Sequence, residues 1–185
     1  MSLTIYLADL MYKNDGVGNK GMPLNIGFLA SYVSARLPGQ VRIRLFKDPE
    51  ALLSMAKSDP PHILGLSNYP WTRNLSLETF KVLKRVQPSL ITVMGGPNYP
   101  DEPHKQVRFM AECEYLDFYT YKESEQTFAG LVSRLLECGL DVGEAKRAPI
   151  PGVHFYDRRE RRLVKGEFIA RLVDLDTVPS PYLTG

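Results

Sequence analysis

The stretch ITVMGGPN, residues 91–98, joins an apolar run of strand character to a glycine-rich break. Two other apolar runs also end in polar breaks, in residues 63–69 (ILGLSNY) and residues 118–125 (FYTYKESE). If the three runs are parallel strands, all three breaks open on one edge of a single sheet, where α/β proteins bind their ligands. The sequence therefore predicts an α/β fold with a ligand site at the carboxyl ends of its strands.

Two further strands are expected on the amino-terminal side of these runs. Residues 3–8 form one, and residues 41–46 form the other. Apolar residues alternate with Arg42 and Arg44 in the latter, which favours an edge strand with one wetter face. The third and fourth strands are more continuously apolar and should be central, so we expect a parallel sheet of five strands.

Segments of helical period separate the expected strands. They predict a helix that begins at Pro23, one that stops before Pro88, and one that begins near Glu123. Strands that alternate with helices are typical of crossover units on a parallel sheet.

The carboxyl-terminal part of the chain has a different pattern. Residues 152–165 predict a β-hairpin whose turn, residues 157–161 (DRRER), is charged, and residues 174–181 follow as a linker. We therefore expect residues 1–148 to form the α/β domain and residues 149–185 to form an appendage and linker. The arginines of the turn face either a partner or, as is commoner for such charge runs, solvent.

Composition limits the classes of partner. The chain has 185 residues and a formal net charge of +2 from well mixed charges, so neither nucleic acid nor another polyanion is indicated. No cationic leader precedes an apolar core and no run approaches about 20 apolar residues, so we expect a cytoplasmic protein without a membrane span. Cys113 and Cys138 are too far apart for a CxxC pair and are expected to pack as small apolar residues of helices.

Residues 16–21 (GVGNKG) formally match the glycine pattern of dinucleotide-binding proteins. In that motif the glycines lie directly between a strand and a helix, whereas here seven residues separate Ala8 from Gly16 and Pro23 opens the helix after the last glycine. Asp48 is a late candidate for the ribose contact. The other interpretation of this segment is a flap over a ligand.

Gly95 and Gly96 provide what a large planar ligand needs at the edge of a sheet. Without side chains, they let the ligand approach backbone amides closely, and the Ser67 hydroxyl adds a polar group beside them. Taken alone, the Gly-Gly-Pro sequence is also an ordinary turn after a strand.

Five blocks of the sequence resemble the cobalamin-binding amino-terminal domain of B12-dependent radical SAM proteins. They are residues 23–30 (PLNIGFLA), 63–69 (ILGLSNY), 93–98 (VMGGPN), 123–128 (ESEQTF) and 150–152 (IPG). The resemblance extends over nearly the whole chain, and residues 174–181 resemble the linker that leads into the catalytic barrel of those proteins. It implies a flavodoxin-like, Rossmann-type three-layer domain that holds cobalamin over the carboxyl edge of its sheet.

The resemblance also implies which residues contact the cofactor. The nucleotide tail of the corrinoid would swing away from cobalt and lie beside the sheet, lined by Ser67, Gly95 and Gly96. Asn68 and Tyr69 would lie under or beside the corrin.

The remaining implied contacts come from the ends of the fourth and fifth strands. Pro97 and Asn98 would follow the turn beside the tail, and Glu123, Ser124 and Glu125 would lie at the exit of the fifth strand. Backbone amides near Ser124, at the start of a helix, are suited to polar groups of the ligand. The Glu123 carboxylate either contacts the ligand or stabilises that helix start.

The chain departs from many cobalamin modules in one respect. An Asp-x-His-x-x-Gly segment often follows the first strand and supplies a histidine to the lower face of cobalt, but residues 9–21 contain no histidine. We therefore expect base-off cobalamin without that ligand. His104 is the one histidine that follows a strand on the ligand side, and a solvated surface role is commoner for such a residue. His62 is expected at the opposite edge of the sheet, and His154 lies in the appendage.

A second departure concerns catalysis. Radical SAM chemistry uses cysteines at CxxxCxxC spacing to hold a [4Fe-4S] cluster, and this chain has two widely separated cysteines. No catalytic or metal-ligating residue is therefore assigned in this chain. We expect a binding module of a larger enzyme, such as a methyltransferase, whose downstream domain holds the cluster and S-adenosylmethionine.

The alternative is a non-catalytic interaction or receiver-like module of the same fold without a cofactor. A phosphoacceptor site uses clustered carboxylates, and Asp9 fits one position, but residues 67–69 supply no second acid. No Gly-x-Ser-x-Gly nucleophile motif indicates a hydrolase. Trp71, the only tryptophan, is expected in the core or facing the ligand or another domain.

Overall fold

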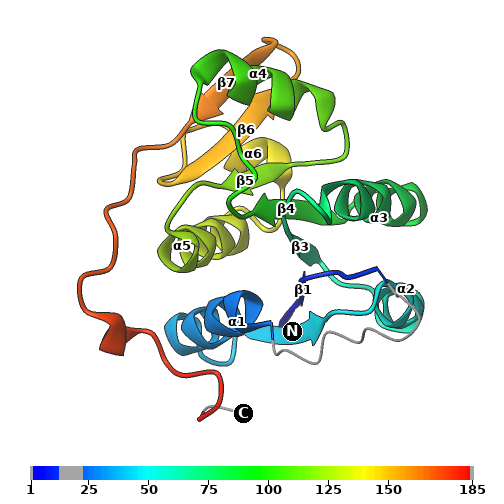
Figure 1. Ribbon diagram of the computed structural model, residues 1–185, viewed down its shortest axis with the longest axis vertical. Helices are drawn as coiled ribbons and strands as arrows, with labels where there is room; N and C mark the ends of the chain where they lie inside the picture. Colours follow the sequence, from blue (N-terminus) through cyan, green and yellow to red (C-terminus); the bar gives the residue numbers. More distant parts are fainter. Residues whose placement is uncertain (1, 13–22, 184–185) are drawn as a thin grey trace.

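The computed structural model describes residues 2–12 and 23–183, and these residues form a three-layer α/β structure (Figure 1). Its sheet has seven strands in the order β2-β1-β3-β4-β5-β6-β7. The strands are β1 (Leu3–Ala8), β2 (Val41–Phe46), β3 (Ile63–Ser67), β4 (Ile91–Gly95), β5 (Phe118–Thr120), β6 (Val153–Asp157) and β7 (Arg162–Lys165).

The first five strands are parallel, as predicted. β2 lies at one edge of the sheet, while β3 and β4 lie inside it. In the register of this pair, Ser67 is opposite Gly95, and in the next pair Gly95 is opposite Thr120. The ends of the third, fourth and fifth strands therefore lie side by side on one edge, which we call the carboxyl edge.

Helices cover both faces of the sheet. They are α1 (Leu24–Arg36), α2 (Pro49–Ser58), α3 (Arg73–Val86), α4 (Pro103–Glu112), α5 (Ser124–Glu137), α6 (Val142–Ala145) and the short 3₁₀ helix η1 (Leu175–Thr177). Figure 1 shows α1 and α5 on one side of the strands and α2 and α3 on the other.

Alternation along each strand divides the core into two. Ile5 and Leu7 of β1 pack in the cluster that includes residues of α1 and α5, whereas Tyr6 and Ala8 pack in the cluster with α2, α3 and α4. Successive side chains of a strand point to opposite faces, so a strand buried on both faces must be apolar at nearly every position. This is why the continuous apolar runs identified the inner strands.

The carboxyl-terminal hairpin differs from the expected fold. It forms as predicted, but β6 pairs antiparallel with β5, so the hairpin continues the sheet from five strands to seven. Val153 and Phe155 of β6 are buried in the same core cluster as α1 and α5. At the hairpin turn, the Arg158 guanidinium donates hydrogen bonds to the carbonyls of Ala111 and Cys113 at the end of α4. This arginine therefore satisfies carbonyl groups that the end of a helix leaves without partners.

Residues 166–183, which we call the strap, follow the hairpin along one side of the molecule (Figure 1). The strap contacts both helices of one face. Arg171 forms an ion pair of 3.2 Å with Glu123 beside α5, and the Ser31 hydroxyl of α1 donates a hydrogen bond of 2.6 Å to the Pro179 carbonyl.

Both cysteines lie at the carboxyl ends of helices. Cys113 is buried at the end of α4, and Cys138 is partly buried at the end of α5. Within residues 2–12 and 23–183, no helix has both the length and the apolar character needed to cross a bilayer.

Candidate cofactor site

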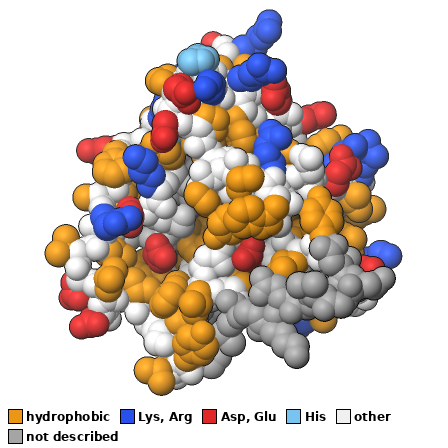
Figure 2. Space-filling view, viewed as in Figure 1, with side chains coloured by type: hydrophobic (Ala, Val, Ile, Leu, Met, Phe, Trp, Pro, Cys, Tyr) orange, Lys and Arg blue, Asp and Glu red, His pale blue; other side chains and the backbone are white. Residues whose placement is uncertain are grey.

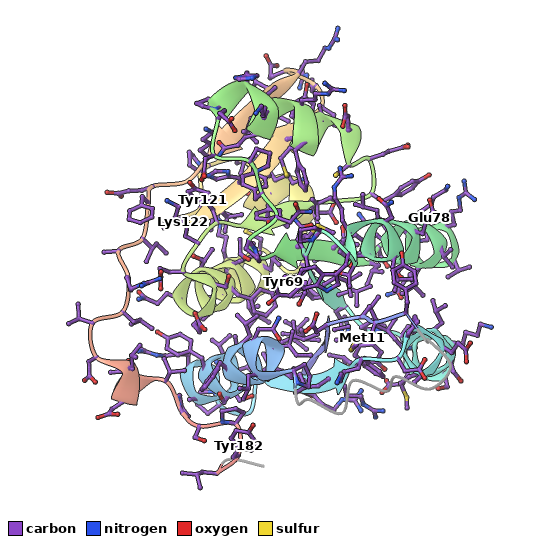
Figure 3. All side chains as sticks on the ribbon, in the orientation of Figure 1. Met11, Tyr69, Glu78, Tyr121, Lys122 and Tyr182 are labelled. Carbon is purple, nitrogen blue, oxygen red and sulfur yellow. The ribbon has the colours of Figure 1, made fainter. Side chains whose placement is uncertain are left out.

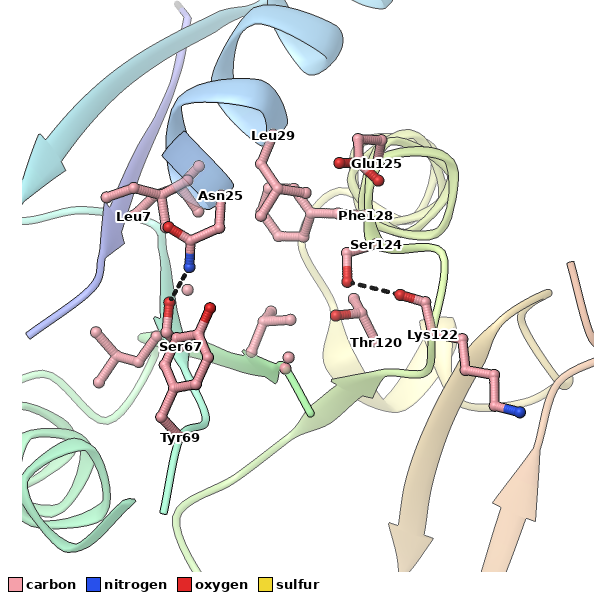
Figure 4. A pocket seen from close by; sticks show the side chains of 16 residues that line it. Leu7, Asn25, Leu29, Ser67, Tyr69, Thr120, Lys122, Ser124, Glu125 and Phe128 are labelled. Carbon is pink, nitrogen blue, oxygen red and sulfur yellow. Dashed lines mark hydrogen bonds between the residues drawn. The ribbon is translucent and has the colours of Figure 1, made fainter. Parts of the chain in front are cut away.

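A cavity of about 190 Å³ opens between α1 and α5 above the carboxyl ends of β1, β3, β4 and β5 (Figure 4). Its lining combines segments that are far apart in the sequence. The residues that line it include Leu7, Asn25, Leu29, Gly65, Ser67, Tyr69, Gly95, Gly96, Thr120, Ser124, Glu125 and Phe128.

The alternation of β3 places two of its side-chain positions on the face where the cavity lies. Gly65 and Ser67 are two positions apart, so they share the face that α1 and α5 cover, and both line the cavity. Asn68 follows on the opposite side of the chain and is fully buried. Ser67 therefore lines the cavity, whereas the next residue, Asn68, does not.

A cluster of polar side chains lies at the end of β3. The Asn25 side-chain amide donates a hydrogen bond of 2.9 Å to the Ser67 hydroxyl, as Figure 4 shows. Burial raises the pKa of the Asp9 carboxyl above its ordinary value, while a hydrogen bond with Ser67 and the charge of Lys47 act in the opposite direction. Burial and the Asp9 charge also raise the pKa of Tyr69. The cavity therefore has one polar wall, made by Asn25, Ser67 and Tyr69, and the Asp9 carboxyl interacts with Ser67 and Tyr69 of this wall.

Apolar side chains form the opposite wall. Figure 4 shows Leu29 of α1 and Phe128 of α5 close together across the upper part of the cavity. Leu7 and Val93 add apolar surface from the sheet. A cavity with apolar walls and a few grouped polar atoms is suited to a flat aromatic ligand that carries polar substituents.

Glycines keep the floor of the cavity open. A Cβ atom on Gly65 would lie 2.6 Å from Cδ2 of Leu7, and one on Gly95 would overlap the Thr120 hydroxyl. Gly96 has a φ of +133°, and its Cβ would lie 2.8 Å from the Asn68 carbonyl oxygen. At Gly96 the added atom would meet backbone, so this conformation requires glycine, whereas at Gly65 and Gly95 a neighbouring side chain would have to move.

The start of α5 borders the cavity. Ser124 is the first residue of the helix, and the first turn of a helix leaves backbone amides without partners inside the helix. Glu123 precedes it without a side-chain cap hydrogen bond and pairs with Arg171 of the strap instead. Lys122 has a φ of 62°, and Figure 4 shows its side chain extending away from the cavity.

The structure brings six of the ten expected site residues together around this cavity. They are Ser67, Tyr69, Gly95, Gly96, Ser124 and Glu125. The other four, Asn68, Pro97, Asn98 and Glu123, do not line it.

Asn68 has a complete set of internal partners. Its side-chain Nδ2 donates to the Asn98 backbone carbonyl at 2.6 Å and to the Tyr119 hydroxyl at 3.1 Å, and its side-chain Oδ1 accepts from Nδ2 of Asn98 at 3.3 Å. Asn68 and Asn98 therefore tie the segment after β3 to the segment after β4. Pro97 and Asn98 border a different, more open hollow on the other face of the sheet, beside Arg73.

Several lining residues were not identified from the sequence. Asn25 and Leu29 lie in the first helix, Thr120 ends the fifth strand, and Phe128 lies in α5. Their position in the sequence is the signal that was available, because each lies within the first two turns of a helix or at the end of a strand.

Two aromatic side chains stack at the carboxyl edge beside the cavity. The rings of Tyr69 and Trp71 have centroids 5.0 Å apart and an angle of 7° between their planes. Trp71 is 68% exposed, which excludes the core position. Figure 2 shows apolar side chains gathered near the middle of the face that Figure 1 views, and Figure 3 places Tyr69 there.

The other candidate residues lie away from the cavity. His104 is exposed in α4, and His62 lies before β3 with its ring nitrogen 3.0 Å from the Thr4 amide. The Asp48 side chain accepts hydrogen bonds from the amides of Glu50 and Ala51 and so caps α2. The glycine pattern of residues 16–21 and the expected flap lie outside the described residues.

Comparison with known proteins gives relatives for most of the chain. No family model matches it. The chain is 33% identical to the cobalamin-dependent radical SAM methyltransferase TokK of Streptomyces tokunonensis over 125 residues, which are 68% of this chain and 17% of TokK. This chain is homologous to part of a cobalamin-dependent radical SAM methyltransferase.

A second relative of this chain matches more of its length. The 2-(S-pantetheinyl)-carbapenam-3-carboxylate methyltransferase of Streptantibioticus cattleyicolor is 30% identical over 169 residues, which are 89% of this chain and 23% of that protein. The chain therefore spans less than a quarter of the length of either relative.

One solved protein structure has the same fold as this chain. The cobalamin-dependent S-adenosylmethionine radical enzyme OxsB, solved with aqua-cobalamin and S-adenosylmethionine, matches 98% of this chain with a TM-score of 0.74 and 20% identity. The match covers 24% of the OxsB chain. It supports the Rossmann-like, flavodoxin-like class of fold.

Proposed function

We propose that this chain binds cobalamin and is the cobalamin-binding module of a larger B12-dependent radical SAM enzyme, such as a methyltransferase. The observation that carries the proposal is the cavity between α1 and α5, because residues from four strand ends and two helices meet there. The homology to TokK, a cobalamin-dependent enzyme, supports the choice of ligand.

The residues of the cavity fit the nucleotide tail of a corrinoid. Leu29 and Phe128 offer apolar surface to a flat aromatic base, and Gly65 and Gly95 leave room beside the sheet. The Ser67 hydroxyl and the first amides of α5 offer polar contacts to the ribose and phosphate of the tail. The corrin would then lie over the carboxyl edge, beside Tyr69 and Trp71.

The remaining expected site residues have two kinds of role in this proposal. Gly96 and Glu125 border the tail together with Ser124. Asn68 and Asn98 hold the ends of β3 and β4 together through their hydrogen bonds, and Pro97 and Glu123 contact the corrinoid at the carboxyl edge.

We further propose that the bound cobalamin is base-off and has no histidine ligand. Residues 9–21 contain no histidine, and His104 is not part of the cavity lining. An electron paramagnetic resonance spectrum of the bound, one-electron reduced corrinoid tests this point. The proposal predicts no threefold splitting from an axial nitrogen, and such splitting would contradict it.

The catalytic domain is part of the proposal as well. Residues 1–148 supply the five parallel strands of the binding domain, and residues 149–185 supply the hairpin that extends its sheet and the linker toward a downstream barrel that holds the [4Fe-4S] cluster and S-adenosylmethionine. The corrinoid supplies the cobalt chemistry when bound, and this chain binds and orients it. Sequencing the gene beyond codon 185 tests the arrangement, since a following CxxxCxxC motif is expected and its absence would contradict it.

Cobalamin binding itself has a simple test. The purified chain is mixed with hydroxocobalamin, desalted, and examined by visible spectroscopy. We expect corrin absorbance to remain with the protein in a near stoichiometric amount, and quenching of the fluorescence of Trp71 to accompany binding. Complete loss of the corrinoid on desalting would favour the alternative, a non-catalytic interaction module without a cofactor.

A further inference from the structure

The strap, residues 166–183, exposes many large apolar side chains. Twelve such side chains are exposed among the described residues, and five of them lie in the strap, although it is only 18 residues long. The five are Phe168, Val173, Leu175, Tyr182 and Leu183. Val173 is 98% exposed and Leu175 is 70% exposed. Single apolar residues are ordinary on a protein surface, whereas apolar residues that gather on one part of it mark an interaction site.

The carboxyl-terminal part of the strap is bound to α1. The buried Ser31 hydroxyl of α1 donates its hydrogen bond to the Pro179 carbonyl of the strap. One turn earlier in α1, a Cβ atom on Gly27 would lie 3.2 Å from Cβ of Pro181, so the strap packs directly on the helix. Figure 3 shows Tyr182 just beyond this contact, at the end of the strap next to α1. This part of the strap therefore has a defined position on the helix.

The middle of the strap packs against the core. Leu172 and Val178 are partly buried and contact the core cluster that contains residues of α1 and α5. Arg171 adds its ion pair with Glu123, but its side chain is 85% exposed, so this pair contributes little. Leu172 packs on the core, whereas the next residue, Val173, is almost wholly exposed. Val173 cannot turn inward without displacing side chains that already pack there.

A short helical turn presents Leu175 to solvent. The turn is η1, and the Asp174 side chain caps it by accepting a hydrogen bond of 3.1 Å from the Asp176 amide. The Thr177 hydroxyl donates a second hydrogen bond, of 2.7 Å, to the Asp174 carbonyl. A surface that is ordered before its partner binds loses less conformational entropy on binding. The outer side of the strap is therefore better suited to docking than a flexible linker rich in glycine and serine is.

The length of the relatives indicates what covers this surface. The chain spans 17% of TokK and 23% of the second methyltransferase relative, so most of each relative lies outside the matched part. In the proposed function, the strap connects the binding domain to a downstream domain of the same polypeptide, which brings that domain close to the strap. Interfaces between domains of one chain bury about 600–1,500 Å². Five large apolar side chains in one segment supply the apolar centre of such an interface.

We propose that the outer side of the strap is a docking surface for the downstream domain, so that the strap lies between the two domains. This inference rests on the proposed function, because it requires a downstream domain. The surface of that domain that covers the strap is apolar opposite Val173 and Leu175. It carries lysine or arginine side chains opposite Asp174 and Asp176, which are both exposed beside Leu175.

Hydroxyl-radical footprinting with mass spectrometry tests the proposal on two proteins. One is the chain of residues 1–185, and the other is the parent protein, which is the whole product of the gene. The radical oxidises side chains according to their exposure to solvent, so each position reports its own burial. The oxidation rates of Val173 and Leu175 should fall at least about fivefold in the parent protein, as at the buried centre of an interface. Val86, which is 76% exposed at the end of α3, should oxidise equally in both proteins.

A pair of variants tests whether these side chains make the contact. In the parent protein, Val173→Asp combined with Leu175→Asp should weaken docking and raise the oxidation rate of Tyr182 at least about threefold, because burying an unpaired charge is unfavourable. Val86→Asp is the matched control and should leave that rate unchanged. In the chain of residues 1–185, both variants should bind hydroxocobalamin as the unmodified chain does, since none of the substituted residues lines the cofactor cavity.

Three results would overturn the proposal. The first is equal oxidation of Val173 and Leu175 in the two proteins, and the second is equal oxidation of Tyr182 in the two parent variants. The third is protection of the strap in residues 1–185 alone as the protein concentration rises, which would assign the surface to a second copy of the chain. Each of these results leaves cobalamin binding by residues 1–185 intact, so a failure of this proposal is distinguishable from a failure of the proposed function.

Discussion

The side-chain nitrogen of Asn25 lies 2.9 Å from the hydroxyl oxygen of Ser67, so the first turn of α1 is tied to the end of β3. The contact crosses the polar wall of the cofactor cavity. Because the two residues come from segments 42 positions apart, the contact sets the separation of helix and strand at the point where a ligand would enter.

Asn25→Ala tests the importance of this contact. The change removes the hydrogen bond to Ser67, and a typical net loss is about 0.5–1.5 kcal/mol. We expect hydroxocobalamin binding, measured by equilibrium dialysis, to weaken about twofold to tenfold. Asn74→Ala is the matched control, since Asn74 is exposed in the first turn of α3. Equal binding by the two variants would show that the Asn25 contact is irrelevant to the ligand.

Gly96→Ala should destabilise the fold. Gly96 has a φ of +133°, and a Cβ atom would lie 2.8 Å from the Asn68 carbonyl oxygen. We expect a loss of about 1–3 kcal/mol in the free energy of unfolding, measured by urea denaturation. Gly130→Ala, in α5 with no atom close to the added methyl group, should instead stabilise the chain by up to about 1 kcal/mol. A neutral result for Gly96→Ala would contradict the described turn.

Phe155→Ala tests whether the hairpin is part of the core. Phe155 is 1% exposed in β6 and packs edge-to-face with Phe118 of β5, so its removal should cost about 3–5 kcal/mol. Phe168→Ala, at a position 59% exposed, should change the free energy of unfolding by less than about 1 kcal/mol. Thermal or urea unfolding measures both. If both variants lost the same small amount, the hairpin would not belong to the core.

His154 predicts a loss of stability in acid. Its pKa is lowered to about 4 in the folded chain, from an ordinary value of 6.5, because burial disfavours the charged ring. As the pH falls, the unfolded chain therefore binds a proton at this histidine before the folded chain does. The contribution of the neutral His154 ring to stability is complete above pH 6.5 and is lost as the pH falls toward 4. The urea midpoint should fall over this range.

Two variants distinguish the titration of His154 from other effects of acid on the stability of the fold. His154→Gln should flatten the fall of the urea midpoint between pH 6.5 and 4, whereas exposed His104→Gln should leave it unchanged. An identical pH profile for His154→Gln and the unmodified chain would mean that this histidine does not titrate as described.

The strands and their directions were predictable because their apolar runs are continuous. A strand inside a parallel sheet is buried on both faces, and few other local structures demand that pattern. The pairing of β6 with β5 was not predictable in the same way. It depends on which sheet edge remains free, which is a non-local property that neither Val153 nor Phe155 signals on its own.

The sequence predicted which edge of the sheet holds the candidate site, but it did not predict which side chains line the cavity. The breaks after the third, fourth and fifth strands do meet, since Ser67 pairs in register with Gly95 and Gly95 with Thr120. The direction of each side chain after a strand ends depends on local turns, so the sequence did not distinguish Ser67, in the cavity, from Asn68, buried behind it. Asn25 was missed because a polar residue in a first helical turn usually faces solvent.

Equilibrium dialysis of hydroxocobalamin against a variant with a filled cavity tests the central proposal most directly. Leu29→Trp places an indole in the wall of the cavity, and Ala35→Trp places one on the exposed side of the same helix. If cobalamin binds between α1 and α5, the unmodified chain and Ala35→Trp should bind it equally, and Leu29→Trp should bind at least about tenfold more weakly, a difference of 1.4 kcal/mol. No binding by the unmodified chain, or equal binding by all three folded proteins, would contradict the proposal.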